Sequence, residues 1–570
     1  MSKTDIRVAD LVGMIERGEL RLPEMQRRYV WQATRVRDLL DSLYRGYPSG
    51  GILVWETDEQ QPSRDLPVNQ QSSPFAGHKL LLDGQQRLTS LSAVLRGAPV
   101  EVRGRKRAID ILFNLEHPEG IFEFTEVEGD EESVLMDDDD ASDADSEEDA
   151  DMTLQERLRT ATFVVSSKSM AGQPNWVSVS AVFKATGDGE ILQKAGVTDF
   201  ADPRYEKYVA RLRRLREIRN YQYVMHVLDR SLSYEEVAEI FVRVNSLGMK
   251  LRGSDLAMAQ ITARWPDSLR LFEHFQVECE EGWFTFDLGL LVRAAVMFAS
   301  DQCRFRSVAR IPVEKLQAGW EQAKRGILYA VNFLRTNAGV EDESLLSSPL
   351  YVLTIAYLAE KHGGQLSAEE SRSLLYWLLV ANAKGRYSRG SSETLLDEDL
   401  ATIRRTGSAK SLIETLRQQF GRLDFDVSDI AGKNARSPIF SLVFLALRAA
   451  GAKDWLSGLE ISLTHQGRLH YVQYHHIFPK ARLRSLYERR EINEIANLAF
   501  IGGGTNRSIS AKLPKDYLPT IVQKQGEVAL ESQCVPCDRS LHELDRYRDF
   551  LAMRREALTQ AINAFVSSMT

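Results

Sequence analysis

A run of acidic residues divides this chain of 570 residues into parts that must fold without it. From Glu126 to Asp151 the sequence holds fifteen aspartates and glutamates and no lysine or arginine. Charges of one sign at this density repel one another, and few apolar side chains accompany them, so we expect a disordered acidic insert at residues 126–152. Two interpretations of the insert stay open: a solvated loop, or a mimic of a nucleic-acid backbone that shields a basic groove.

The rest of the chain is basic. The whole sequence has a net charge of −8, and removing the fifteen acidic residues leaves −8 + 15 = +7, which is compatible with a polyanionic substrate. No stretch approaches the roughly 20 apolar residues that cross a bilayer. The N-terminus has no apolar signal region, and four cysteines are too few for a disulfide framework in a chain of this length. We therefore expect a cytoplasmic protein with no membrane partner.

The hydrophobic pattern changes twice along the chain. Before residue 255, strand-like runs such as Ile52–Trp55 alternate with amphipathic helices such as Arg35–Gly46. A long succession of amphipathic helices follows, and a strand-like run returns near Arg468. These patterns predict an α+β fold class in a mainly helical multidomain chain. The predicted domains are an α+β domain, a helical middle domain and a C-terminal domain, at residues 1–254, 255–430 and 431–570.

Residues 79–91, KLLLDGQQRLTSL, pack three long polar side chains into one turn. Lys79–Leu82 is a buried-type strand, Asp83 is a favourable N-cap, and leucines at helical spacing follow until Gly97. The polar side chains therefore lie in the first helical turn, where free N–H groups and the helix dipole favour an anion. A phosphate or nucleobase site and a capped helix with polar surface residues fit this pattern equally well, because no Walker loop is present.

Three stretches decide between these readings by resemblance: RLPEMQRRYVW from Arg21, LLDGQQRLTSL from Leu81 and EEVAEIFVRVNSLGMKLRGSDL from Glu235. They look like the N-terminal domain of GmrSD-type and SspE-type restriction proteins, which is related to the ParB/sulfiredoxin fold. The resemblance implies a centre that binds and hydrolyses a nucleoside triphosphate (ATP, GTP or CTP). It implies that this centre is lined by Asp83, Gly84, Gln85, Gln86 and Arg87 and faced by Gln26, Arg27 and Trp31, with Trp31 as a stacking surface.

A second polar pattern lies near the C-terminus. His475 and His476 are followed by the residues IFP, Asn497 opens an apolar strand, and Asn506 follows a glycine turn. The arrangement looks like an HNH, or ββα-metal, nuclease motif. A nearby CxxC pair, Cys534 and Cys537 with His542, is compatible with zinc, but without a second pair it favours a plain turn.

The HNH resemblance assigns a role to each of the four polar residues. His476 would be the general base, because an imidazole titrates near working pH. His475 and Asn506 would hold one divalent metal, and Asn497 would fix the catalytic imidazole by a hydrogen bond. Many relatives have a carboxylate where this chain has His475. The expected ion is Mg²⁺ or Mn²⁺. A neutral imidazole in place of the carboxylate moves the preference away from Mg²⁺ and toward Mn²⁺, Ni²⁺ or Zn²⁺.

Together the resemblances imply a nucleotide-regulated anti-phage DNA endonuclease of the modification-dependent, type IV restriction class. Its N-terminal NTPase domain would sense modified phage DNA and control cleavage by the HNH domain. The expected partners are DNA, a second copy of the chain and proteins of a defence system. Two alternatives stay open: a ParB-like, nucleotide-switched DNA-binding protein with a degenerate HNH domain, and an enzyme that cleaves RNA.

Overall fold

The structure is a computed structural model, and it describes residues 2–23, 31–57, 63–64, 78–102, 108–118, 161–247, 253–281, 284–388, 391–462 and 472–569. The predicted acidic insert lies outside these residues. The chain divides into two compact units, Met1–Leu269 and Arg270–Thr570. The predicted fold class is confirmed, because the chain is mainly helical and carries several small sheets. The predicted domain boundaries at 254 and 430 stay predictions.

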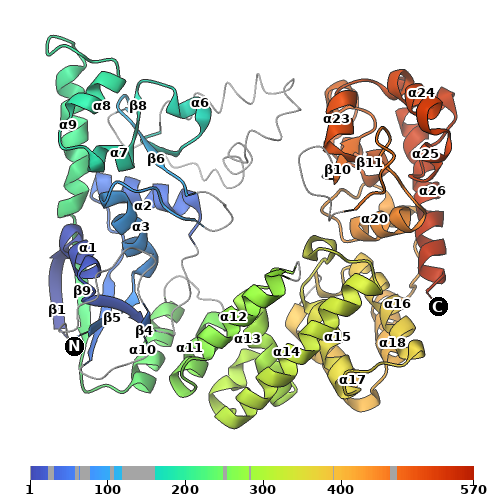
Figure 1. Ribbon diagram of the computed structural model, residues 1–570, viewed down its shortest axis with the longest axis horizontal. Helices are drawn as coiled ribbons and strands as arrows, with labels where there is room; N and C mark the ends of the chain where they lie inside the picture. The colour runs from blue at the N-terminus through green and yellow to red at the C-terminus, as the bar shows by residue number, and fades with distance from the viewer. Residues whose placement is uncertain are drawn as a thin grey trace. The chain divides into compact units, whose positions relative to one another are not determined.

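The first unit is built on a six-stranded mixed sheet (Figure 1). In sheet order the strands are β1 (Ser2–Arg7), β9 (Gln222–Leu228), β3 (Ile52–Thr57), β5 (His78–Asp83), β2 (Leu20–Pro23) and β4 (Ser63–Arg64). The central strand β3 runs parallel to β9 and antiparallel to β5. Its first four residues, Ile52–Trp55, are apolar in succession, which is the pattern of a strand buried on both faces.

Helices cover both faces of this sheet. Ile52 and Val54 point into a core formed with α1 (Val8–Glu16), α2 (Ala33–Arg45) and α3 (Gln85–Leu95). Leu53 and Trp55 point the other way, onto residues of α10 (Tyr234–Leu247) and α11 (Gly253–Arg264). Because side chains alternate along a strand, β3 contributes to both cores. The β5–α3 turn follows the strand that pairs with β3, so its position depends on β3.

The remaining elements of the first unit form a smaller layer beside the main sheet. It holds a three-stranded antiparallel sheet in the order β7 (Phe163–Val165), β6 (Ile111–Asn114), β8 (Trp176–Ser178). The helices of this layer are α6 (Lys168–Ala171), α7 (Val179–Lys184), α8 (Gly189–Lys194) and α9 (Tyr205–Arg216), followed by the 3₁₀ turn η1 (Glu217–Asn220). α12 (Ser268–Glu281) contains the boundary between the two units.

The second unit begins as a stack of helices. They are α13 (Leu288–Ser300), α14 (Val313–Thr336), α15 (Leu350–Lys361), α16 (Ala368–Lys384), α17 (Ser392–Thr406), α18 (Ala409–Phe420), α19 (Val427–Ile430) and α20 (Ile439–Ala449). α15 is buried along nearly its whole length. A buried ion pair joins the end of α16 to α17: the Arg386 guanidinium donates two hydrogen bonds of 2.7 Å to Asp399.

The chain ends in a small α+β part of the same unit. Its two-stranded antiparallel sheet joins β10 (Val472–His476) to β11 (Leu498–Gly502). The helices around it are α21 (Lys480–Leu483), α22 (Arg489–Ile492), α23 (Gly503–Ile509), α24 (Pro514–Gln525), α25 (Val528–Glu531) and α26 (Tyr547–Ser567). Within the described part of the chain, no helix combines the length and apolar character needed to span a membrane.

Candidate active site

The β5–α3 turn depends on a glycine. Gly84 precedes α3 with φ +100°, in the left-handed region that favours glycine. A Cβ atom at this position would lie 2.5 Å from Cδ1 of Ile52, so a larger residue would force the Ile52 side chain to move. The predicted N-cap at Asp83 is therefore wrong: Asp83 ends β5, and the cap position belongs to Gly84 without a side-chain hydrogen bond.

Arg87 uses its guanidinium to fasten this turn to the loop before β3. Its Nη1 donates to Ser49 O at 2.5 Å, and its Nη2 donates to Gly51 O at 2.8 Å and to Asp83 Oδ2 at 3.0 Å. Only 12% of the side chain is exposed. A Cβ at Gly50 would clash with Nη1, so the SGG loop leaves just enough room for the arginine. Arg87 thus holds the turn together with hydrogen bonds to its own chain.

The neighbouring glutamines lie differently. Gln86 Oε1 accepts a hydrogen bond from the backbone N–H of Trp31 at 3.2 Å, which joins the DGQQR turn to the end of the QRRYVW motif. Gln85 is buried, and its Nε2 has no hydrogen-bond partner among the residues that the structure describes. Trp31 is half-buried and packs on the core beside α1–α3. Gln26 and Arg27 lie outside the described residues.

The second site is a β-hairpin followed at once by a helix. β10 and β11 pair with His475 opposite Ala499 and His476 opposite Leu498, and α23 starts where β11 ends. This order, strand, strand, helix, brings Asn506 on α23 next to β10. His475 Nδ1 lies 2.7 Å from Asn506 Oδ1, although 31 positions separate the two residues.

A third residue orients this pair. Asn506 Nδ2 donates to Gln473 Oε1 at 2.7 Å, which turns the amide oxygen of Asn506 toward His475. Gln473 was not singled out in the sequence, but the alternation of a strand could have found it. Residues two apart point to the same face, so Gln473 must accompany His475.

His476 follows His475 at the end of β10, so its side chain points to the other face of the strand, where the centroid of its ring lies 6.5 Å from that of the Tyr474 ring. Its Nε2 is buried and has no hydrogen-bond partner in the described part of the chain. Burial lowers the pKa of His476 to about 3, and the positive charge of Lys480 and the His475 ring act in the same direction, while a hydrogen bond with Asn493 opposes them. The imidazole is therefore neutral at physiological pH, and the expectation that it titrates near working pH is wrong for the structure as it stands, because burial disfavours the charged ring.

Asn497 does not contact the His476 ring by any hydrogen bond found here. Its amide donates to Phe478 O at 3.1 Å and Ile492 O at 3.0 Å, and its Oδ1 accepts from Phe478 N at 2.9 Å. Its backbone carbonyl accepts from Ile477 N at 2.8 Å. Asn497 therefore fixes the backbone that follows His476, so that it positions the imidazole through the chain and not by the direct bond predicted from the sequence.

The last helix holds this loop in place. Arg554 on α26 is fully buried and donates from Nη1 to Ala496 O at 2.8 Å, beside Asn497. Burial lowers the pKa of Arg554 to about 10. The next residue, Arg555, donates two hydrogen bonds to the buried carboxylate of Glu494, at 2.5 and 2.7 Å. The segment that carries Asn497 is thus anchored through buried, charged contacts.

The contact of His475 with Asn506 is a hydrogen bond in which the amide oxygen accepts, so the two atoms would serve a divalent cation as a pair only when the imidazole proton lies on Nε2 instead of Nδ1. Two donor atoms about 2.1 Å from one ion lie about 3 Å apart when they subtend a right angle, close to the observed 2.7 Å. One imidazole nitrogen and one amide oxygen leave most coordination positions to water or phosphate oxygens, as is usual for metals that act on phosphate esters.

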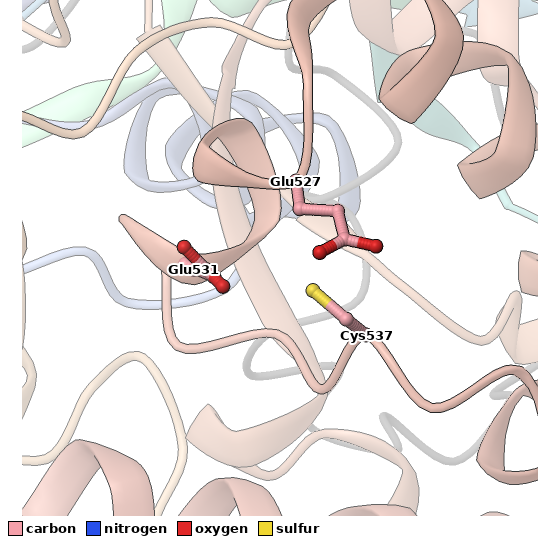
Figure 2. Close-up of side chains that lie close together, drawn as sticks. All are labelled: Glu527, Glu531 and Cys537. Atoms are coloured by element: carbon pink, nitrogen blue, oxygen red, sulfur yellow. The ribbon is translucent and has the colours of Figure 1, made fainter.

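A separate group of possible metal ligands lies on the surface of the second unit. Figure 2 shows the carboxylates of Glu527 and Glu531 facing the Sγ atom of Cys537, and one ligand atom of each lies within 4.8 Å of the others. Both glutamates are exposed. Cys534 and His542 are not part of this group, and His542 Nε2 lies 2.8 Å from Pro536 O. Among the described residues, Cys534, Cys537 and His542 are thus not brought together as one group of possible metal ligands.

The comparisons with known proteins concern both units. Residues 8–262 match the family model of the GmrSD restriction endonuclease N-terminal domain. The chain is also 21% identical over 561 residues to the uncharacterized protein MJ0686 of Methanocaldococcus jannaschii. The alignment covers 91% of this chain and 87% of that protein. The family match covers less than half of the chain, and it makes the N-terminal part similar to a restriction endonuclease N-terminal domain. The similarity to the archaeal protein extends across both units.

Proposed function

We propose that this protein is a metal-dependent DNA endonuclease of the modification-dependent restriction class, in which the C-terminal ββα part cleaves phosphodiester bonds. The observation that carries the proposal is the approach of His475 Nδ1 to Asn506 Oδ1, 2.7 Å apart, at the residue next in the chain to His476, whose Nε2 has no partner among the described residues. The match of residues 8–262 to a restriction endonuclease domain supports DNA as the substrate.

His476 would act as the general base. Its neutral imidazole would take a proton from a water molecule at Nε2, and the resulting hydroxide would attack phosphorus as the bond to the leaving oxygen breaks. A divalent cation, when bound, supplies positive charge against the phosphate oxygens and the leaving group. His475 and Asn506 would hold that cation, and Asn497 would keep the backbone after His476 in place while the proton moves.

The residues also favour particular ions. Imidazole nitrogen binds Mn²⁺, Ni²⁺ or Zn²⁺ more readily than Mg²⁺, which prefers carboxylate and water oxygen. A site with His475 and without a carboxylate is therefore expected to give faster cleavage with Mn²⁺ or Ni²⁺ than with the same concentration of Mg²⁺.

The N-terminal part would bind and hydrolyse a nucleoside triphosphate and thereby control cleavage. In the described turn, the groups left to contact a ligand are the Asp83 carboxylate, which is 40% exposed, and the backbone N–H groups at the start of α3. Arg87 would support these groups by fixing the turn. Sensing of modified phage DNA, self-association and contacts with other defence proteins belong to the same proposal.

The test is nicking of supercoiled plasmid by the full chain in a titration of Mg²⁺, Mn²⁺ and Ni²⁺. Modified and unmodified phage DNA are compared, each with ATP, GTP and CTP. His476→Ala should slow cleavage by about 10²–10⁴-fold, the usual contribution of a general base. Its DNA affinity should be unchanged, while its melting temperature should fall by a few degrees, because the variant loses the packing of the ring and its hydrogen bond with Asn493.

A matched control is His274→Ala, which removes an exposed histidine on α12. This variant should cleave at the parent rate. Full cleavage by His476→Ala would refute the assignment of the base. Metal-independent binding of DNA, with no cleavage by the parent under any of these conditions, would instead favour a nucleotide-switched DNA-binding protein with a degenerate nuclease part. Cleavage of RNA in preference to DNA would reassign the substrate.

A further inference from the structure

Asp454 is a buried carboxylate in the turn after α20. Only 6% of the residue is exposed, yet no cationic side chain contacts its oxygens by any hydrogen bond or ion pair found among the described residues. Neutral donors satisfy it instead. Three of them, Leu456 N at 3.3 Å, Ser457 N at 2.8 Å and Ser457 Oγ at 2.6 Å, belong to its own turn. These bonds close the turn locally.

The other two donors belong to the ββα part. Gly502 N, at the end of β11, donates to Asp454 Oδ1 at 2.6 Å, and Thr505 Oγ1, in the first turn of α23, donates to Asp454 Oδ2 at 2.7 Å. Asn506 follows Thr505 directly. The two oxygens of one carboxylate therefore fix both the point where β11 becomes α23 and the helical turn that carries Asn506.

The residue after Asp454 reaches the other proposed metal ligand. Trp455 is fully buried, and its ring meets the His475 ring edge-on, with centroids 6.4 Å apart and an interplanar angle of 82°. The indole cannot rotate freely, because Nε1 donates to Ala529 O at 3.2 Å. Tyr517 packs on both rings, at 6.1 and 6.0 Å, and its hydroxyl donates to Ile477 O at 3.0 Å.

We propose that Asp454 is a positioning residue for the metal site: it holds α23 so that Asn506 Oδ1 faces His475 Nδ1, while Trp455 holds the His475 ring. This inference rests on the proposed function, because it assumes that His475 and Asn506 bind the cation. Partners of this kind behind metal ligands usually change metal affinity when they are removed. Asp454 touches neither substrate nor metal, so its effect must pass through Thr505 and Gly502.

Two hydroxyls on the same oxygen provide a matched pair of variants. Thr505→Val and Ser457→Ala each remove one hydroxyl that donates to Asp454 Oδ2, at 2.7 and 2.6 Å. Only the first bond leads to α23. We therefore expect Thr505→Val to weaken Mn²⁺ binding by roughly 3–10-fold, and Ser457→Ala to change it by less than about twofold, because only the former loosens a support of a metal ligand.

Asp454→Asn should have a larger effect in the same direction, about 10-fold or more on Mn²⁺ affinity. In this variant the amide oxygen would replace Oδ2, and the NH₂ group would replace Oδ1. The N–H of Gly502 would then face another donor and lose its acceptor at the entry to α23. If this variant fails to fold, the Thr505→Val and Ser457→Ala pair still decides the question.

The experiment uses the full chain with Mn²⁺ as the only added metal. Electron paramagnetic resonance of the free ion measures Mn²⁺ binding, and a nicking assay measures the Mn²⁺ concentration that gives half the maximal rate. Thr505→Val should raise the dissociation constant of Mn²⁺ and also the Mn²⁺ concentration that gives half-maximal nicking. At saturating Mn²⁺ it should recover nearly the parent rate, whereas Ser457→Ala should match the parent throughout. Equal shifts in the two variants, or no shift in either, would overturn the role of Asp454.

Failure of the proposed function gives a different result. If His475→Ala binds Mn²⁺ as tightly as the parent, the metal site itself is misassigned, whatever the Asp454 variants do. If His475→Ala abolishes Mn²⁺ binding while Thr505→Val and Ser457→Ala behave alike, the metal site stands and only the positioning role falls.

Discussion

The β5–α3 turn and the β10–β11 hairpin both place polar side chains where a strand ends, but they use these side chains in opposite ways. In the turn, Arg87 donates to Ser49 O, Gly51 O and Asp83. In the hairpin, the Nε2 atom of His476 makes no hydrogen bond within the described part of the chain. The first arrangement stabilises the fold, and the second leaves a buried ring nitrogen without a partner among the described residues.

Two buried histidines repeat this contrast. Burial lowers the pKa of His117 to about 4 and that of His476 to about 3. The rings otherwise differ, because His117 Nε2 lies 3.0 Å from the Tyr44 hydroxyl and its Nδ1 lies 2.9 Å from Pro118 O. A lowered pKa alone therefore does not identify a catalytic histidine. A ring nitrogen without a partner, in the residue next to a candidate metal ligand, is the more informative feature.

Arg87→Met offers the strongest way to break the comparison. The variant keeps an unbranched apolar stem but leaves three acceptors in the turn without their donor, and we expect it to destabilise the first unit by about 3 kcal/mol. Hydrogen exchange of peptides from α3 and from residues 49–57 would measure the loss. If protection is unchanged while nucleotide turnover disappears, Arg87 contacts the ligand and the turn resembles the hairpin after all.

The pH dependence of the first unit sharpens the comparison. The pKa of His117 is about 4 in the folded chain and near 6.5 in the unfolded chain, so the unfolded state binds the additional proton between these values. Stability is therefore fully present above pH 6.5 and is lost as the pH falls toward 4. The expected loss is roughly 2–3 kcal/mol.

His117→Gln tests the source of this pH dependence, because glutamine does not titrate. The parent and the variant would be unfolded with urea at intervals from pH 7 to pH 4, with hydrogen exchange in β6 as the local measure. The difference between the two chains should shrink as the pH falls. A constant difference across this range would show that His117 is not the titrating group.

Local patterns in the sequence predict the elements well where one segment decides its own structure. The helix expected at Arg35–Gly46 is confirmed as α2, which ends at Gly46 with φ +75°. The leucine spacing after Asp83 predicts α3, and the strand-like run near His475 predicts β10. In each segment the apolar period and a terminating glycine or turn lie within a few residues of one another.

Partners that are distant in the chain could not be predicted in this way. Arg87 binds backbone carbonyls of Ser49 and Gly51, and a backbone acceptor leaves no trace in the sequence. Asp454 lies 51 positions before Thr505, in a turn whose own pattern indicates only local closure. The sequence thus identifies which residue types gather at a strand end, whereas only the fold determines which of them remain available.

The smallest expected effect concerns Gln86, which joins the turn to Trp31. Gln86→Leu removes the acceptor for the Trp31 N–H, and we expect a cost of about 1 kcal/mol, seen as faster exchange of that amide. Gln86→Glu keeps an oxygen acceptor of nearly the same shape, so exchange should stay close to that of the parent. Equal exchange in the two variants would mean that Gln86 is not committed to this bond. The turn would then hold an unused polar group, as the hairpin does, and the contrast between the two sites would rest on Arg87 alone.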